Sequence, residues 1–468
     1  MSAPATTAPA PRRASEAQLL VFAVLIAMAA YAAVSLAHDE RVDAAVLTYG
    51  AGLAVLFGLA HLAVRRLAPA ADPVLLPLAA VVNGLGLAMV RRLDLAAIDT
   101  ARARGRSMPA ALAPRQLMWT AVATLVFIGV LAVVRDHRTL DRYRYTAMAV
   151  GLALLLLPAL PVIGTEINGA RIWIRVGSLQ FQPAEIAKLC LIVFFASYLV
   201  AKREVLALAS RRVAGLNVPR ARDLGPVLVA WAASLLVLVR EKDLGSSLLF
   251  FGLFIVMLYI ATERTSWLLI GLGLFSAGTV VAHALFSHVR ERVDTWLHPF
   301  ADAADNGFQL TQALFGMATG GLFGTGLGRG RPDSVPEAKT DFIFAALGEE
   351  LGLVGVVAVL VVFTLLVARG IRVGLGVRDD FGKLLAGGLA FAMALQVFVV
   401  VGGVTRLIPL TGVTLPFTSY GGSSLVANYA LVALLLRISD SGRIPEPGTA
   451  AQLREGEITG EMTQVVSR

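Results

Sequence analysis

The sequence predicts an all-α polytopic membrane protein with about twelve transmembrane helices. Hydrophobic residues make up 57% and charged residues only 16% of its 468 residues, whereas soluble domains average about 45–50% apolar and about 25% charged residues. Apolar runs long enough, or nearly long enough, to cross about 30 Å of hydrocarbon recur along the chain. They lie at 18–37, 45–64, 74–90, 116–134, 145–163, 184–201, 224–240, 244–262, 266–287, 350–369, 384–404 and 422–437. No soluble domain of ordinary size fits between them.

The ends of the chain and two of the runs need separate comment. Residues 1–17 are rich in Ala, Pro, Thr and Ser, and residues 439–468 are polar, so we expect a disordered and a flexible tail. The run at 18–37 is a helix rather than a signal peptide, because it exceeds a signal h-region of about 7–15 residues. Only three charged residues separate 224–240 from 244–262. That pair fits either two spans or one broken helix and its neighbour.

The positive charge of the chain indicates orientation rather than nucleic-acid binding. The 41 Lys and Arg residues exceed the 32 Asp and Glu residues, giving a net charge of +9. Most arginines lie between apolar runs, and the inner segments carry the excess if both termini are cytoplasmic and the long loop 288–349 is discounted. We therefore expect both termini inside and loop 288–349 outside. The basic segment 91–115 is the main contradiction, because it would also be external.

The loop 288–349 is long enough to have structure of its own. Loops of this length are usually functional or disordered, and its many large apolar residues argue against disorder. An amphipathic spacing around 307–318 predicts short helices at the outer membrane surface.

Residues 164–188 form the first segment with chemical interest. Pro183 suits the first turn of a helix, and Glu185 and Lys188 lie one turn apart on the same face. A helix start with a local ion pair is one interpretation. The other is a functional site, because ionisable groups inside a membrane are costly enough to indicate function.

Just upstream, three large polar or aromatic side chains alternate along the chain. Arg171, Trp173 and Arg175 have the spacing of an extended segment that shows one face. We expect this segment at the outer surface. Trp173 is equally consistent with an interfacial anchor.

A carboxylate lies where the long loop re-enters the apolar slab. Asp341 is followed at once by an apolar stretch that begins at Phe342. Partial burial there raises a carboxyl pKa or demands a cation, which makes Asp341 a candidate general base or metal ligand. The alternative is a helix cap at Asp341, with Glu349 and Glu350 as surface charges.

Two further segments are rich in glycine or proline. Residues 316–330 contain seven glycines, which suggest backbone amides exposed to an anion beside Arg329 and Arg331. Close helix contacts or loop flexibility explain them equally well, and the ending of a P-loop is absent. Prolines and glycines within 406–424 prevent a regular helix at membrane depth, so this segment must line a cavity or be buried in protein. Arg406 at its start could meet a lipid phosphate.

Four strings in this chain resemble the SEDS family, which comprises RodA, FtsW and SpoVE. They are NGARIWIRVGSLQFQPAEIAKL, EKDLGSSLL, TDFIFAALGEELGLVG and LPFTSYGGSS, in this order and with a long loop before the third. The resemblance spans about residues 115–438, the expected catalytic core, which follows an N-terminal transmembrane segment at 18–114. It implies a ten-helix core with two extra N-terminal spans. The TRLIPLTG string and the long N-terminal part look most like the actinobacterial RodA branch.

The resemblance implies a peptidoglycan glycosyltransferase of the bacterial plasma membrane. Such an enzyme polymerises lipid II at the outer leaflet for cell elongation and shape, paired with a class B penicillin-binding protein. The essential acid of the family falls on Asp341, its cavity pair falls on Glu185 and Lys188, and its tryptophan falls on Trp173.

The chain departs from the family at two of these strings. Many members have an arginine before the tryptophan, where this chain has Ile172, so Arg171 or Arg175 would have to substitute. The usual Gln-Pro of the second string is replaced by Glu241 and Lys242. The segment around Asp243 could therefore have another role.

The implied chemistry needs three features. A carboxylate must deprotonate a sugar hydroxyl or hold a divalent cation, Mg or Mn, and Asp341 is the candidate for both. Positive charge must face the diphosphate, and an apolar groove must take the lipid tail. The candidates for that charge are Lys188, Arg171, Arg175 and Arg406. Competing functions are a transporter or flippase of lipid-linked precursors and a scaffold for division or elongation.

Overall fold

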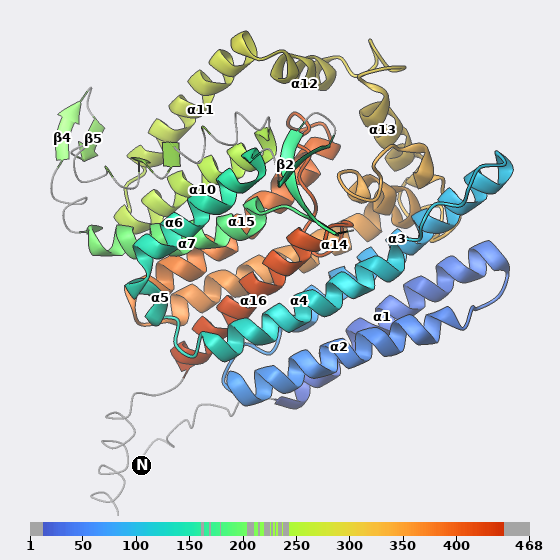
Figure 1. The fold of residues 1–468 in the computed structure, drawn as a ribbon, viewed down its shortest axis with the longest axis horizontal. Coiled ribbons are helices and arrows are strands. Elements are labelled where there is room, and N and C mark those ends of the chain that lie inside the picture. The colour runs from blue at the N-terminus through green and yellow to red at the C-terminus, as the bar shows by residue number, and fades with distance from the viewer. Residues whose placement is uncertain are drawn as a thin grey trace, which may run out of the picture.

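The chain folds into a bundle of long helices that run side by side (Figure 1). The computed structural model describes residues 13–160, 163–167, 170–177, 179–203, 210–213, 216–219 and 243–443, with isolated positions between 225 and 236. Within these residues, ten helices are long and apolar enough to cross a membrane. They are α1 (Arg13–Asp39), α2 (Ala45–Leu67), α3 (Leu75–Ala103), α4 (Ala113–Val133), α7 (Ala184–Ala201), α10 (Leu244–Thr262), α11 (Ser266–Leu285), α14 (Ile343–Gly376), α15 (Asp380–Val404) and α16 (Gly422–Arg443).

Two of the twelve predicted spans are not among these ten helices. The run at 145–163 forms α6 (Arg144–Leu156), which passes into the short 3-10 helix η1 (Leu157–Ala159) and ends early. Pro158 lies within η1, and proline cannot continue a regular helix because it lacks an amide hydrogen. A one-turn helix, α5 (Thr139–Arg142), precedes α6. The run at 224–240 lies largely outside the described residues.

Several predicted boundaries shift. α1 begins at Arg13 and α16 continues to Arg443, so residues 13–17 and 439–443 of the expected tails are helical. α3 continues to Ala103, which places Arg91 and Arg92 in a helix rather than in an external loop. α14 begins at Ile343, before the predicted residue 350, and contains a break at Gly352.

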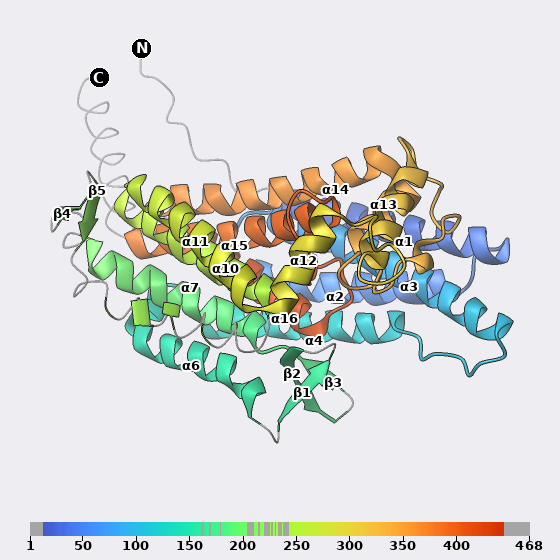
Figure 2. The same ribbon diagram turned by 90° about the horizontal axis from the view of Figure 1, so that it is seen from above.

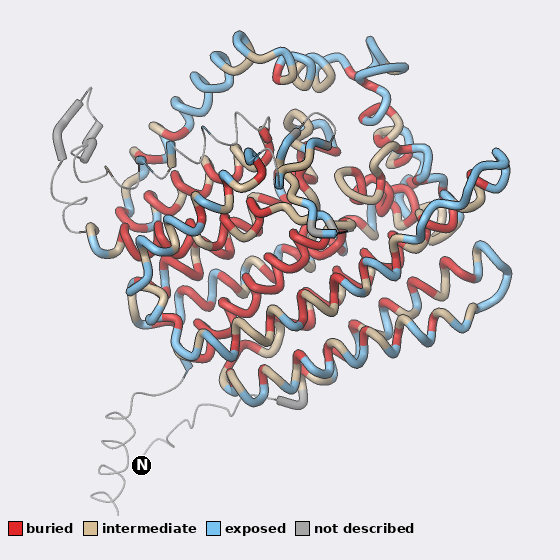
Figure 3. Tube along the Cα trace, in the orientation of Figure 1, coloured by how far each residue is buried: buried red, intermediate tan, exposed pale blue. Residues whose placement is uncertain are grey.

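The helices differ in how much of their surface other helices cover. In Figure 3 the buried residues gather along the middle of the bundle, with α16 at its centre. The membrane-spanning stretch of α16 is 100% buried inside the protein, whereas that of α11 is only 6% buried. α11 therefore lies at the edge, and its apolar face is suited to lipid.

Two small antiparallel sheets accompany the helices, which the all-α prediction did not include. β1 (Gly164–Ile167), β2 (Ala170–Val176) and β3 (Leu179–Phe181) form the first, with Thr165 opposite Trp173 and Arg175 opposite Gln180. β4 (Ser210–Val213) and β5 (Leu216–Pro219) form the second. The extended segment predicted at 171–175 is confirmed as β2.

Hydrogen bonds gather helix termini at one end of the bundle. Asp440 near the end of α16 accepts from the amide of Ala70, 2.7 Å away, and Arg437 donates to the carbonyls of Leu67 and Leu131. His137 meets Asp379 at 3.0 Å. These contacts join the end of α2, the end of α4 and the start of α15 to the end of α16.

The long loop and the first sheet lie toward the other end (Figures 1 and 2). The loop contains α12 (Ser287–Leu297), α13 (Phe308–Gly320) and the 3-10 helix η2 (Pro332–Ser334). α13 confirms the helix predicted around 307–318. Opposite ends of the bundle thus carry different structures.

A buried ion pair attaches the long loop to the bundle. Arg92 Nε donates to Glu350 Oε1 at 2.8 Å, and Arg92 Nη2 donates to the carbonyl of Gly330 at 2.6 Å. The side chains of Arg92 and Glu350 are 10% and 0% exposed, and Glu349 is also buried. The alternative in which Glu349 and Glu350 are surface charges is therefore wrong.

The glycine-rich stretch is folded around these two glutamates. The amide of Gly328 donates to Glu350 Oε2 at 3.0 Å, and the amide of Arg331 donates to Glu349 Oε1 at 2.5 Å. A Cβ at Gly324, where φ is +80°, would lie 2.2 Å from the carbonyl oxygen of Glu350. Within the stretch, the amides of Thr325 and Gly326 donate to the carbonyls of Glu349 and Glu350 and that of Gly328 donates to a carboxylate, so these amides are not free for an external anion.

We predict that Arg92→Ala destabilises the protein by about 3–5 kcal/mol, because it leaves the Glu350 carboxylate buried without its cation. Arg102→Ala on the same helix is the control, since its ion pair with Asp99 is exposed and should contribute about 1 kcal/mol or less. Thermal unfolding in detergent measures both. Equal losses for the two variants would contradict the assignment.

Candidate functional site

An irregular segment, residues 405–421, joins α15 to α16 beside the long loop. It contains Pro409 and Pro416, and its backbone groups bond to the surrounding protein. The amide of Leu415 donates to Ser419 Oγ at 2.9 Å, and that hydroxyl donates to the carbonyl of Thr340 at 2.6 Å. The irregular backbone predicted here is confirmed. Its second half, residues 413–419, is largely buried in protein, whereas residues 405–412 are exposed or partly buried.

The predicted pair on α7 forms a buried ion pair. Lys188 Nζ lies 2.9 Å from Glu185 Oε2 and donates to Gln396 Oε1 at 2.7 Å. Gln396 on α15 donates in turn to the carbonyl of Thr414 at 3.0 Å. The pair is therefore connected to the irregular segment, and the charge of Lys188 is balanced within the protein.

Asp341 does not cap α14. The N-cap position is Phe342, and no side chain caps this helix. Asp341 is half-buried between the long loop and the irregular segment. Burial and repulsion from Glu337 raise the pKa of its carboxyl to about 6, while Arg292 opposes the rise. Such a group is ionised at neutral pH and still close to protonation.

Arg292 on α12 is the cation that the sequence interpretation missed. Its Nη1 donates to the carbonyl of Leu410 at 2.9 Å. A Cβ on Gly412 would lie 3.7 Å from Asp341 Oδ2 and 3.8 Å from Arg292 Nη2, so the two charged groups flank the same glycine. Burial lowers the pKa of Arg292, and Asp243 and Asp341 oppose that shift.

Asp243 interacts electrostatically with Arg292 and with Glu185. Its Oδ1 accepts from the amide of Ser246 at 2.9 Å and so caps α10, while its Oδ2 has no hydrogen-bond partner among the described residues. Burial raises the pKa of Asp243, Arg292 lowers it, and Glu185 raises it further. The carboxylates of Glu185, Asp243 and Asp341 are thus electrostatically linked. Glu241 and Lys242 lie outside the described residues.

Arg406 contacts α12 rather than Asp341. Its Nε donates to the carbonyl of Trp296 at 2.8 Å, and its Nη2 donates to the carbonyl of Leu297 at 2.7 Å. Trp296 Nε1 donates back to the carbonyl of Arg406 at 3.0 Å. The expected contact with a lipid phosphate stays a prediction.

The remaining predicted residues lie on β2. Arg171 and Arg175 are exposed, and Trp173 is half-buried. In the described part of the chain, no hydrogen bond joins them to Asp341, Arg292 or Lys188. The structure therefore groups Glu185, Lys188 and Asp341 with two residues of other segments and leaves the β2 residues apart.

The donors around Asp341 fit a metal only in part. Within the described residues, no group of three or more His, Cys, Asp or Glu side chains could hold an ion. Magnesium is commonly held by one or two carboxylates together with substrate phosphates. Asp341 fits that arrangement, so a divalent cation here would need ligands from the substrate.

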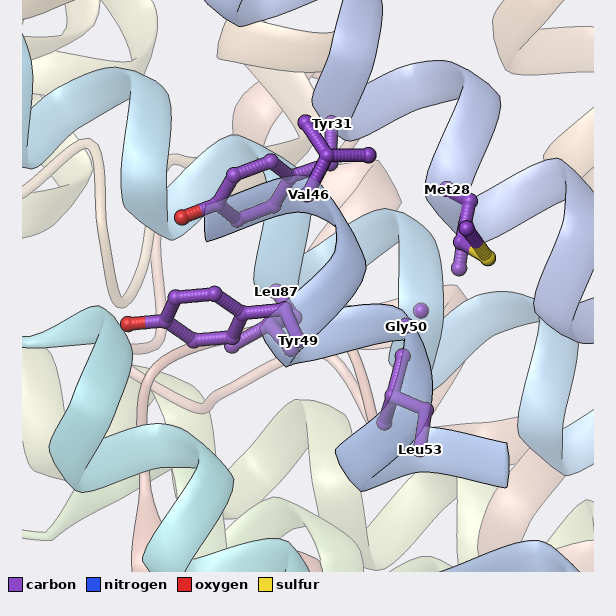
Figure 4. A pocket seen from close by; sticks show the side chains of 9 residues that line it. Met28, Tyr31, Val46, Tyr49, Gly50, Leu53 and Leu87 are labelled. Atoms are coloured by element: carbon purple, nitrogen blue, oxygen red, sulfur yellow. The ribbon is translucent and has the colours of Figure 1, made fainter. Parts of the chain in front are cut away.

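A separate apolar pocket lies among the N-terminal helices (Figure 4). Its free interior is only about 10 Å³, and it is lined by residues of α1, α2 and α3, including Met28, Gly50 and Leu87. Tyr31 and Tyr49 stack at 4.8 Å beside it. None of its lining residues belongs to the Asp341 cluster.

We predict that Gly412→Ala destabilises the protein by about 1–2 kcal/mol, because φ is +75° there and an L-residue is strained in that conformation. Gly421→Ala in the same segment is the control, since a Cβ there meets only ordinary contacts. Thermal unfolding compares them. A neutral Gly412 variant would show that the segment adapts.

Comparisons with known proteins agree with this architecture. The family model of the cell cycle proteins FtsW, RodA and SpoVE matches residues 73–444. The peptidoglycan glycosyltransferase RodA of Mycobacterium tuberculosis is 50% identical over 466 residues, which cover 99% of this chain and 98% of its own. Stage V sporulation protein E of Bacillus subtilis is 37% identical over 334 residues, 71% of this chain and 87% of its own.

Solved structures show the same fold. A chain from a peptidoglycan synthase complex, described for its coordination of polymerization and crosslinking, is 29% identical with a TM-score of 0.62, covering 80% of this chain and 99% of its own. The rod shape determining protein RodA of Thermus thermophilus, in its crystal structure, is 26% identical with a TM-score of 0.54. The match covers 80% of this chain and 98% of its own. The chain is a multi-pass membrane protein and belongs to the FtsW, RodA and SpoVE family.

Proposed function

We propose that this protein is a peptidoglycan glycosyltransferase that polymerises lipid II into glycan strands for cell elongation and shape. One observation supports it above the others: a half-buried carboxyl, Asp341, has a pKa raised to about 6 and lies beside the guanidinium of Arg292. The likeness to mycobacterial RodA over nearly the whole chain points the same way. The polymerisation would take place at the outer leaflet of the bacterial plasma membrane.

Asp341 is the proposed general base. The acceptor hydroxyl of one sugar attacks the anomeric carbon of another, and Asp341 takes the proton of that hydroxyl. The bond from the anomeric carbon to the diphosphate breaks, and undecaprenyl diphosphate leaves with the electron pair. A base with a pKa near the working pH is suited to this step, because it is mostly ionised and still holds the proton well.

The other predicted site residues are proposed to bind substrate. Glu185, Lys188 and Trp173 would line the groove that the substrate requires. Arg171, Arg175 and Arg406 would face the charged groups of the substrate. A divalent cation, Mg or Mn, held by Asp341 and the diphosphate would neutralise negative charge on the diphosphate. A class B penicillin-binding protein is the proposed partner. This follows the family resemblance and the complex to which the first of the two structures above belongs.

We also propose twelve spans, with α6 and residues 224–240 added to the ten helices above. Both termini would then be cytoplasmic, and the loop 288–349 would be external. The distribution of Lys and Arg supports this orientation. So does the grouping of the long loop with Asp341, because lipid II polymerisation needs an external site.

The transporter and scaffold alternatives find less support. A secondary carrier is expected to place its key charges near the bilayer midplane, at the interface of related halves. Here Asp243 and Asp341 lie just before the membrane helices α10 and α14, and Arg292 lies on α12 in the long loop. A scaffold does not require a carboxyl whose pKa is raised to about 6 at the centre of a charged cluster.

We predict that Asp341→Asn lowers lipid II polymerisation about 10²–10⁴-fold, because it removes the base. In the unchanged protein, activity should rise with pH through about 6 as Asp341 ionises. Glycan products made by the purified protein with its partner, separated on gels, give the rate, and repeating the assay with a chelator tests the cation. Asp333→Asn is the control, since Asp333 is exposed in the same loop. Normal polymer yield from Asp341→Asn would refute the assignment.

The same variant should be more stable than the unchanged protein at neutral pH. The folded-state pKa of Asp341 lies above its ordinary value of 3.8, so the fold loses stability as the pH rises from about 4 to about 6, and the full loss persists at higher pH. Asn carries no charge, and its benefit should vanish as the pH falls below about 4, where both forms are neutral. Thermal unfolding at pH 7.5 and pH 4 checks this. A less stable variant at pH 7.5 would argue against it.

For the orientation, we predict that a cysteine at the exposed Ser334, in a variant without Cys190, reacts with an impermeant thiol reagent in intact cells. The control is a cysteine at Ser441, at the opposite end of the bundle. Labelling of Ser441→Cys, but not of Ser334→Cys, from outside would reverse the topology.

A further inference from the structure

One helix of the long loop, α12, contacts the irregular segment 405–421, and its Arg292 interacts electrostatically with Asp341. α12 follows α11, which lies at the edge of the bundle (Figures 1 and 3). Three hydrogen bonds with Arg406 hold its last turn. Trp296 Nε1 donates to the carbonyl of Arg406, and the Arg406 side chain donates to the carbonyls of Trp296 and Leu297. We call this set of bonds the α12 clasp.

The α12 clasp fixes the face of the helix that carries Arg292. Arg292 and Trp296 are four residues apart, so their side chains lie on the same face of α12. Arg406 holds its side of the clasp at φ +62°, a left-handed conformation that is costly for a residue other than glycine. A strained residue that persists in a site indicates that its contacts are needed there.

Arg292 still has donors to offer. Its Nη1 donates to the carbonyl of Leu410. Asp341 and Asp243 attract it, yet neither forms an ion pair with it within 4 Å among the described residues. An arginine has five N–H donors arranged to bind phosphate in a bidentate manner. The side of Arg292 nearest Asp341 can therefore take anionic oxygens.

Two of the other cations near the site have hydrogen-bond partners within the protein. Lys188 bonds to Glu185 and Gln396, and Arg406 donates to two carbonyls of α12. Arg292 is the cation that, among the described residues, flanks Gly412 together with Asp341.

We propose that Arg292 is a catalytic residue that binds the diphosphate of the departing undecaprenyl group, and that Trp296 and Arg406 are positioning residues that hold it there. This inference rests on the proposed glycosyl transfer. As the bond between the anomeric carbon and the diphosphate breaks, negative charge grows on the diphosphate. A guanidinium held beside Asp341 stabilises that charge while Asp341 takes the proton of the acceptor hydroxyl.

The test uses Arg292→Gln and Arg292→Lys in the full-length protein with its partner. Arg292→Gln should lower kcat about 10²–10³-fold, as expected for removing one oriented donor group to developing charge. Arg292→Lys should recover only part of the rate, because it keeps the charge and loses the bidentate geometry. Arg290→Gln is the matched control, since Arg290 is exposed on the same helix and donates to the carbonyl of Ala284. Its rate should stay within about twofold of the unchanged protein.

A second measurement separates this inference from the proposed function. Added undecaprenyl diphosphate should inhibit the unchanged protein, and Arg292→Gln should weaken its binding, measured directly with the purified protein. When binding is measured without a divalent cation, which Asp341 is proposed to share with the diphosphate, Asp341→Asn should retain that binding, and the same variant should lose polymerisation. If the unchanged protein makes no polymer, the proposed function fails. If it makes polymer and Arg292→Gln keeps the rate and the diphosphate affinity, only the inference about Arg292 fails.

The positioning role is tested by a double-mutant cycle. Trp296→Phe removes the indole donor and should weaken diphosphate binding and lower kcat, with little change in thermal stability. In the Arg292→Gln background, Trp296→Phe should have no further effect, because the two residues act as one unit. Additive losses would show that Trp296 acts independently of Arg292 and would overturn the positioning role.

Discussion

The need to satisfy non-helical backbone at the membrane organises this end of the molecule. Residues 405–421 cannot form a helix, so their amides and carbonyls need partners that lipid does not provide. Those partners come from separate parts of the chain: Gln396 on α15, Arg292 on α12 and Lys339 in the long loop. These bonds join α12, α15 and the long loop to the segment beside Asp341. The site is therefore a consequence of how this backbone is buried.

The carboxylates at the end of the long loop and at the start of α14 have different surroundings. Glu349 and Glu350 accept backbone amides and the guanidinium of Arg92, so their charge is fully used to hold the glycine-rich stretch. For Asp341, the stabilising effects of Arg292 and Thr340 on the carboxylate are outweighed, and the pKa of its carboxyl rises to about 6. Burial and repulsion from Glu337 cause this rise. A structural anchor in the first turns of α14 and an acid with a raised pKa at the end of the loop thus lie close together along the chain.

The local features of the sequence predicted much of the fold. Hydropathy located the spans, proline and glycine located the irregular segment, and alternation located β2, because each depends on residues near one another in the chain. The boundaries were less accurate. α3 continues past the apolar run at 74–90 because Arg92 finds a buried partner in Glu350, which no local pattern reveals. α6 is shorter than its apolar run, which contains Pro158.

For the site, the sequence by itself determined that Glu185 and Lys188 share a helix face and that Asp341 lies at the edge of the apolar slab. Helical periodicity and hydropathy are sufficient for both. Only the tertiary structure decided that Asp341 is not a cap, that the amide of Gly328 binds an internal carboxylate, and that Arg292 and Asp341 both lie beside Gly412. These residues lie far apart in the chain, and the packing of the loop against the bundle is what brings them together.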